Sequence, residues 1–200
     1  ASGVRFGAQA VGQNLYNSGR ISACVLGRKD PKFITGFAQG GEVNLAMMQG
    51  EMDGRWTIQQ TLVRQAPEWI SKKLVDFHIV HDVPKGRRHP HPVYAQLPDL
   101  ERFTKSDKER NILAMQRAFV SAGTPFMFPP GTPPDKVQML REAMRKSFAD
   151  PEFFAEFKKL VGEEPTPLPA DELEKAIRDL PRDRETIDLF NKLSGADALP

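Results

Sequence analysis

The sequence contains a single cysteine, Cys24, among 200 residues. One cysteine cannot build an intramolecular disulfide framework or a cysteine-based zinc site, so both are excluded as sources of stability. A chain of this length buries about 70% of its unfolded surface, which is enough for folding without such cross-links. Cys24 lies in an apolar stretch beside Val25 and Leu26, which favours a buried structural thiol over a nucleophile.

Long apolar runs, nucleotide motifs and an excess of one charge are also missing. No stretch approaches the roughly 20 apolar residues of a membrane-spanning helix. The sequence has no G-x-x-x-x-G-K-[ST] phosphate loop, no G-x-G-x-x-G turn after a strand and no G-x-S-x-G serine elbow. The net charge is only +2 and the basic residues are scattered. We therefore expect no nucleic-acid partner, no cofactor and no membrane-embedded segment.

The first half of the chain alternates short β-rich runs with helical runs. Strands are predicted at residues 4–8, 32–37, 54–58 and 75–80, with helices at 14–26, from 40 onward and at 60–74. This order predicts an α/β domain whose parallel-type sheet is flanked by helices. From His81 to Leu97 the pattern stops in a proline-rich connection, so the α/β domain is predicted to span residues 1–97.

The second half, residues 98–200, is predicted to consist of one strand, at 124–130, and several helices. A helical period returns at 107–122. "TPPD" (132–135) and "DPE" (150–152) each place a capping residue, a proline and an acid where helices begin. Two further helices are predicted at residues 171–180 and 182–193, the last ending before Gly195.

The histidines are the side chains best suited to metal binding or acid–base chemistry: His78, His81, His89 and His91. His78 and His81, three apart on a predicted strand, point to opposite faces, and a pair flanking one proline needs further ligands from elsewhere. A structural or surface role is therefore preferred for all of them. A small α/β enzyme or a metal-binding protein that uses these histidines is the alternative, although no carboxylate pair stands out as its acid and base.

Two glycine-containing turns form the candidate ligand site. They are "FGAQAVGQN" (6–14) and "AQGGEVN" (38–44), and each follows a predicted strand and precedes a predicted helix. Glycine lets a backbone approach a ligand, and the free N–H groups of a helix start favour a carboxylate. Turns that follow adjacent parallel strands share one sheet edge, where α/β proteins bind ligands. The other interpretation, that both are simply tight turns, is equally open.

Several segments, in this order, resemble one protein family. They are "VRFGAQAVGQN" (4–14), "GFAQGGEVNLAMMQGEMDGRW" (36–56), "YAQLPDLERF" (94–103), "FMFPPGTPPDKVQMLREAMRKSFADPEF" (126–153) and "VGEEPTPLPADELEKAI" (161–177). The set is similar to the substrate-binding receptors of tripartite tricarboxylate transporters, the Bug family of periplasmic binding proteins.

The resemblance implies a type II periplasmic-binding-protein-like lobe with a helical C-terminal segment, located in the periplasm. Such a receptor is not an enzyme: it captures a small carboxylate and presents it to membrane permease components. Family members have a full first lobe ahead of this segment, so a receptor fragment or a shortened relative is expected, whose C-terminal helices pack on the missing lobe or link to it. A sensory or interaction domain derived from a binding protein is the remaining alternative. The implied ligand-binding residues are Ala8, Gln9, Ala10, Val11, Gly12, Gln13, Gln39, Gly40, Gly41, Trp56 and Thr57.

Overall fold

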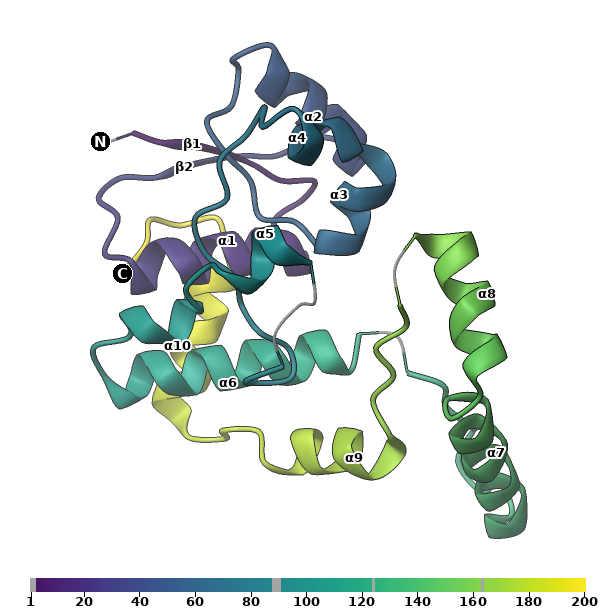
Figure 1. Ribbon diagram of the computed structural model, residues 1–200. Coiled ribbons are helices and arrows are strands. Elements are labelled where there is room, and N and C mark those ends of the chain that lie inside the picture. The colour runs from purple at the N-terminus through teal and green to yellow at the C-terminus, as the bar shows by residue number, and fades with distance from the viewer. Residues whose placement is uncertain (1–2, 88–90, 124, 163) are drawn as a thin grey trace.

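The computed structural model describes residues 3–87, 91–123, 125–162 and 164–200, and these residues are mostly helical (Figure 1). Within them, helices surround one two-stranded parallel sheet. The elements in chain order are β1 (Arg5–Gly7), α1 (Asn14–Val25), β2 (Lys32–Ile34), α2 (Gly40–Met48), α3 (Gln59–Gln65), α4 (Pro67–Ser71), α5 (Pro92–Ala95), a 3-10 helix η1 (Leu100–Phe103), α6 (Asp107–Ser121), α7 (Pro134–Ser147), α8 (Pro151–Val161), α9 (Ala170–Arg178) and α10 (Arg184–Ser194). None of the helices in the described part of the chain is long and apolar enough to cross a membrane.

The sheet consists of β1 and β2, joined by the crossover helix α1. The strands pair in register, with Phe6 opposite Phe33. On the other side of β1, Gly54 adds a single parallel bridge to Phe6. Gly7 lets α2 approach the sheet closely, because a Cβ at this position would lie only 2.5 Å from Cγ1 of Val43. The sequence of strand, helix, strand and helix at residues 5–48 therefore folds as predicted.

The predicted extent of the sheet is wrong. Residues 55–58 and 75–79 form no strand, and Val80 makes only an isolated bridge, to Asp99. Residues 125–130 are also irregular, while position 124 lies outside the described residues. The β-rich composition of these runs was not sufficient, because a strand needs a neighbouring backbone along its length. The predicted helix 60–74 is divided into α3 and α4 at Pro67, which lacks the N–H group a helix interior requires.

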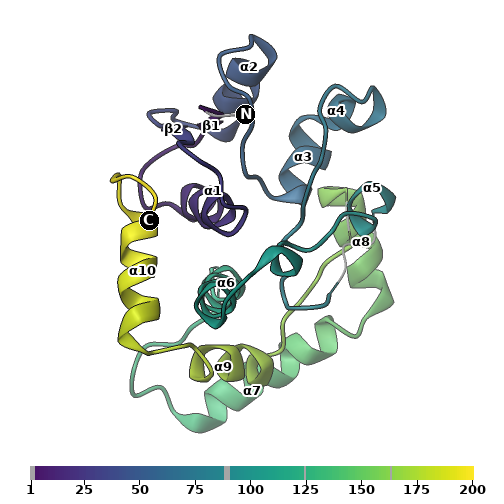
Figure 2. The same cartoon turned by 90° about the vertical axis from the view of Figure 1, so that its left-hand side faces the viewer.

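The main core lies between α1, α6 and α10. Its buried apolar residues are Ile21, Val25, Leu100, Ile112, Leu113, Leu189 and Leu193. Helix α6 packs against α1, α9 and α10, and Figure 2 looks almost along its axis. This core thus combines elements from both sides of the predicted boundary at residue 97, and the division into two domains stays a prediction.

Arg20 fastens α1 to the end of α10. Its buried guanidinium donates hydrogen bonds of 2.6–3.3 Å to the backbone carbonyls of Lys192, Leu193 and Asp197. The carbonyls at a helix C-terminus carry partial negative charge, so a cation is stabilised there. The rings of Tyr16 and Phe33 lie 5.6 and 5.5 Å from the same guanidinium, within cation–π range. These carbonyls and rings thus stabilise the charge of Arg20, with which no carboxylate of the described residues pairs.

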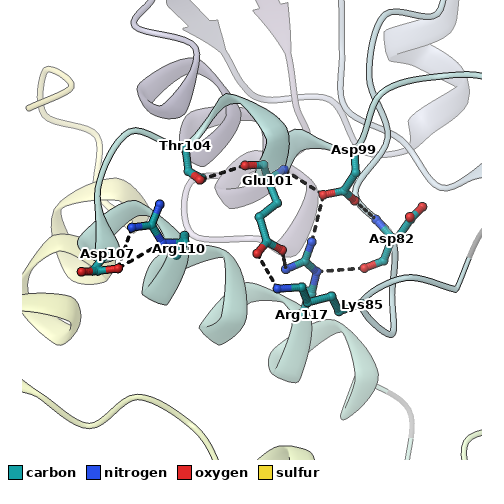
Figure 3. A network of polar contacts seen from close by, with 8 residues as sticks. All are labelled: Asp82, Lys85, Asp99, Glu101, Thr104, Asp107, Arg110 and Arg117. Atoms are coloured by element: carbon teal, nitrogen blue, oxygen red, sulfur yellow. Dashed lines mark hydrogen bonds and ion pairs between the residues drawn. The ribbon is translucent and has the colours of Figure 1, made fainter.

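A polar network anchors the long connection before η1 to α6 (Figure 3). Arg117 of α6 donates to Asp99 Oδ1 at 3.0 Å, to Glu101 Oε2 at 2.6 Å and to the backbone carbonyl of Asp82 at 2.9 Å. Asp99 accepts in turn from the backbone N–H of Asp82, and Lys85 donates to Glu101. Ion pairs and hydrogen bonds therefore fix the proline-rich connection to α6, in addition to its own turns.

His81 adjoins this connection, and its buried ring is expected to make the stability of the fold depend on pH. Its Nε2 atom is buried and has no hydrogen-bond partner among the described residues. Burial lowers the pKa of His81 to about 4, and the positive charge of Arg117 acts in the same direction. As pH falls from about 6.5, an ordinary histidine pKa, to about 4, the unfolded state therefore binds the proton first and stability is lost.

We expect the melting temperature to decrease over that pH window, and to decrease less steeply in His81→Gln. Thermal unfolding followed by circular dichroism from pH 7.5 to pH 4 measures both slopes. Because carboxylates also titrate in this range, the comparison is with His78→Gln, which changes an exposed histidine. Equal slopes for the two variants would contradict the prediction.

The segment formed by residues 125–162, called the arm below, stands apart from the main core in Figure 1. Neither α7 nor α8 has a buried residue, and the same holds for α9, which follows the arm. Several of the large apolar side chains of the arm are exposed, including Phe126, Met127 and Leu160. An ion pair between Arg141 and Glu174 connects α7 to α9. The arm thus carries apolar surface that the core does not cover.

Candidate functional site

The two predicted turns meet at one edge of the sheet. After β1, the backbone N–H of Ala8 donates to Ile34 O at 3.0 Å. The carbonyl of Gln9 accepts from the N–H of Gly36 at 2.9 Å, and its side-chain amide donates to Ala38 O at 3.3 Å. The structure therefore places the first turn, residues 8–13, directly beside the loop that leads to Gln39, Gly40 and Gly41.

The start of α1 is open. Gln13 occupies the N-cap position but its side chain accepts no capping hydrogen bond, and the first turn contains no acidic residue. Ala10, Val11, Gly12 and Gln13 are all exposed. Gly12 has a positive φ of 79° and its carbonyl accepts from the side chain of Asn17 at 3.1 Å, which fixes the turn. The first N–H groups of a helix have no intrahelical acceptor, so this end can receive an anion.

The start of α2 is already partly occupied. The carboxylate of Glu42 accepts from the backbone N–H of Ala38 at 2.8 Å, as in a capping box. The carbonyl of Gly40 accepts from Arg55 at 2.5 Å, while Gly41 faces open space. Other side chains therefore occupy the start of α1 less than they occupy the start of α2.

Arg55, which the sequence analysis did not single out, connects the third segment to this edge. Its Nη1 donates to Gly40 O and, at 2.7 Å, to the side-chain oxygen of Asn44 in α2. Its Nε donates to Trp56 O at 3.4 Å. Burial alone lowers the pKa of Arg55, and no carboxylate among the described residues pairs with it. A single charge inside the β-rich run "GRWTI" was the signal that could have identified it.

The other two residues of this segment were predicted. Trp56 lies against α1, where a Cβ on Gly19 would be 4.0 Å from its own Cβ, and it packs on the main core. The hydroxyl of Thr57 is buried and has no hydrogen-bond partner within the described chain. Such an unsatisfied polar group is costly unless water or a ligand binds it.

A cleft of about 2160 Å³ opens beside these residues. One wall comes from α1 and the segments around residues 52–59 and 74–84, and the other from the arm and α9. Arg55, Trp56 and Thr57 line this cleft, whereas residues 8–13 and 39–41 lie outside its lining. The predicted residues therefore adjoin one another in the fold but do not share a single cavity. The cleft also exceeds the roughly 300–1,000 Å³ that is usual for a small-molecule site.

The three described histidines, His78, His81 and His91, all line the cleft. His78 is exposed, and Nδ1 of His91 accepts from the backbone N–H of Val93 at the start of α5. His89 lies outside the described residues. Within the described part of the chain, no group of three or more His, Cys, Asp or Glu side chains could hold a metal ion. Burial raises the pKa of the Cys24 thiol, which disfavours the reactive thiolate.

Comparison with known proteins adds no relative to this description. No protein-family model matches the chain, and no curated protein matches it significantly. The functional conclusion therefore depends on the residues and on the geometry described above.

Proposed function

We propose that the chain is the ligand-binding lobe of a periplasmic solute receptor, which captures a small carboxylate and presents it to membrane permease components. The observation that carries this proposal is the meeting of three segments at the carboxyl ends of parallel strands: the turn after β1, the loop after β2 and the Arg55 segment. Ligands bind at this edge in α/β proteins. The open start of α1 and the guanidinium of Arg55 both favour negative charge.

In this proposal the lobe is of the type II periplasmic-binding-protein kind, and the arm serves to pack on a companion lobe. The exposed apolar residues of the arm and the absence of buried residues in α7, α8 and α9 support that role. The size of the cleft is also in accord with it, because a second lobe would fill part of the space and leave a smaller site.

The proposal is tested by screening the chain against small carboxylates for thermal stabilisation. Succinate, glutarate, citrate and benzoate are compared with their neutral amides at equal concentration and ionic strength. A ligand present at 100 times its dissociation constant is expected to add about 2.7 kcal/mol to the free energy of unfolding. If no carboxylate raises the melting temperature above the value obtained with its amide, the proposed function is wrong.

A further inference from the structure

Arg55 differs from the other arginines that hold the fold together. Arg117 binds two carboxylates, and Arg5 forms a hydrogen-bonded ion pair with Asp53 at 2.7 Å. Arg20 pairs with no carboxylate among the described residues, but it is surrounded by three carbonyls and two aromatic rings. Arg55 is only partly satisfied by comparison, since the acceptors that its Nε and Nη1 atoms reach are neutral oxygens.

The unsatisfied side of Arg55 is its Nη2 group. Nη1 uses its hydrogens on Gly40 and Asn44, and Nε contacts Trp56 O, but Nη2 has no acceptor among the described residues. Arginine stays charged in proteins, and a partly desolvated charge is ordinarily paired. The bonds to Gly40 and Asn44 fix the position of the guanidinium, while the two N–H groups of Nη2 remain available.

Arg55 lines the cleft, and so does Thr57 two residues further on, although the hydroxyl oxygen of Thr57 is itself buried. Two neighbouring carboxylates are already engaged, since Asp53 is bonded to Arg5 and Glu42 accepts from the N–H of Ala38. Arg55 is thus a cationic donor at the cleft, and no carboxylate among the described residues forms an ion pair with it.

We propose that Arg55 binds the anionic group of the ligand through Nη2 within the cleft. This inference rests on the proposed function and adds to it: affinity depends on a negatively charged oxyanion group, and Arg55 determines that specificity. Carboxylate, sulfonate and phosphate groups share the required chemistry, because each presents a negatively charged oxygen to the N–H groups of Nη2.

The test observes the Nε–H signals of the arginine side chains by NMR in the full chain labelled with ¹⁵N. Succinate, methanesulfonate and inorganic phosphate are titrated separately at constant ionic strength, and neutral succinamide is the control. We expect the Nε–H signal of Arg55 to shift with at least one of the anions and not with succinamide. Comparison of the three anions identifies the source of the charge that the site prefers.

Variants separate this inference from the function on which it rests. Arg55→Gln, which removes the charge but keeps an amide donor, is expected to weaken anion binding by about tenfold to hundredfold. Arg55→Lys keeps the charge and should lose less, and Arg64→Gln, an exposed arginine on α3, should bind as the wild type does. Circular dichroism melting of each variant verifies folding.

The outcomes are distinct. If succinate shifts the backbone amides of residues 8–15 while the Arg55 signal and the affinity of Arg55→Gln stay unchanged, the role of Arg55 is refuted and the proposed function survives. If none of the three anions binds at tens of millimolar while the wild type is folded, both proposals are refuted. Loss of affinity in Arg64→Gln equal to that in Arg55→Gln would show a general charge effect and would also refute the specific role.

Discussion

Replacing Arg117 with alanine is expected to lower the free energy of unfolding by about 3–5 kcal/mol, the usual cost of removing one partner from a buried ion pair. The side chain of Arg117 is only 9% exposed, and it contacts both Asp99 and Glu101. Without it, two partly buried carboxylates would face each other beside the backbone carbonyl of Asp82. Urea unfolding at pH 7, followed by circular dichroism, measures the change.

Arg110→Ala is the matched control, because Arg110 lies on the same helix and pairs with Asp107 at 2.6 Å. Its side chain is 46% exposed, and exposed helical pairs of this kind contribute only a few tenths of a kcal/mol. Similar losses for the two variants would mean that the contacts of Arg117 in Figure 3 contribute no more than the Arg110–Asp107 pair drawn there.

Acid should reduce the contribution of this network. Burial by itself raises the pKa of Glu101, but the hydrogen bonds from Lys85 and Arg117 outweigh it, so that the pKa is lowered overall. A carboxyl group with a depressed pKa stabilises the fold above its unfolded pKa and loses that contribution as pH falls through the folded value. The difference between wild type and Arg117→Ala is therefore expected to be largest near neutral pH.

Leu113→Ala is expected to cost about 2–5 kcal/mol, the range for a leucine truncated in a well-packed core. Leu113 is 0% exposed, and it lies on α6 within the cluster shared with α1 and α10. The loss combines the transfer of the removed methyl groups with the cavity that remains. The same urea unfolding experiment measures it.

Leu160→Ala provides the contrast on α8 of the arm. Leu160 is 80% exposed, so its truncation should change the free energy of unfolding by no more than about 0.5 kcal/mol. A loss above about 2 kcal/mol at Leu160 would show that the arm is packed in solution. That result would remove the support that the exposed arm gives to a companion lobe.

The helices of this chain were largely predictable because their signals are local. Asp150 accepts from the N–H of Glu152 with Pro151 between them, and α8 begins there as the sequence predicted. Asp183 likewise caps α10 through the N–H of Thr186. The strands predicted at 54–58 and 75–80 are wrong, because a strand needs a neighbouring backbone along its length and these segments form only single bridges, at Gly54 and at Val80.

The candidate site likewise contains residues that local sequence patterns predict and residues that they do not. The turns at 8–13 and 38–41 could be identified from glycine and from the neighbouring strand and helix patterns. Arg55 is marked in the sequence only as a single charge inside a β-rich run, because its contacts with Gly40 and Asn44 of α2 depend on the tertiary fold. The hydroxyl of Thr57 was included by resemblance alone, and its unsatisfied state is likewise a property of the whole fold.

The exposed arm affects how cooperatively the chain unfolds. Opening of a segment costs free energy in proportion to the buried contacts that it breaks, and α7 and α8 bury no residue. These helices can therefore fray and re-form while α6 stays intact, so that the molecule has a rigid part and a part with its own melting equilibrium. A surface that covers Phe126, Met127 and Leu160 would join the two into a single cooperative unit.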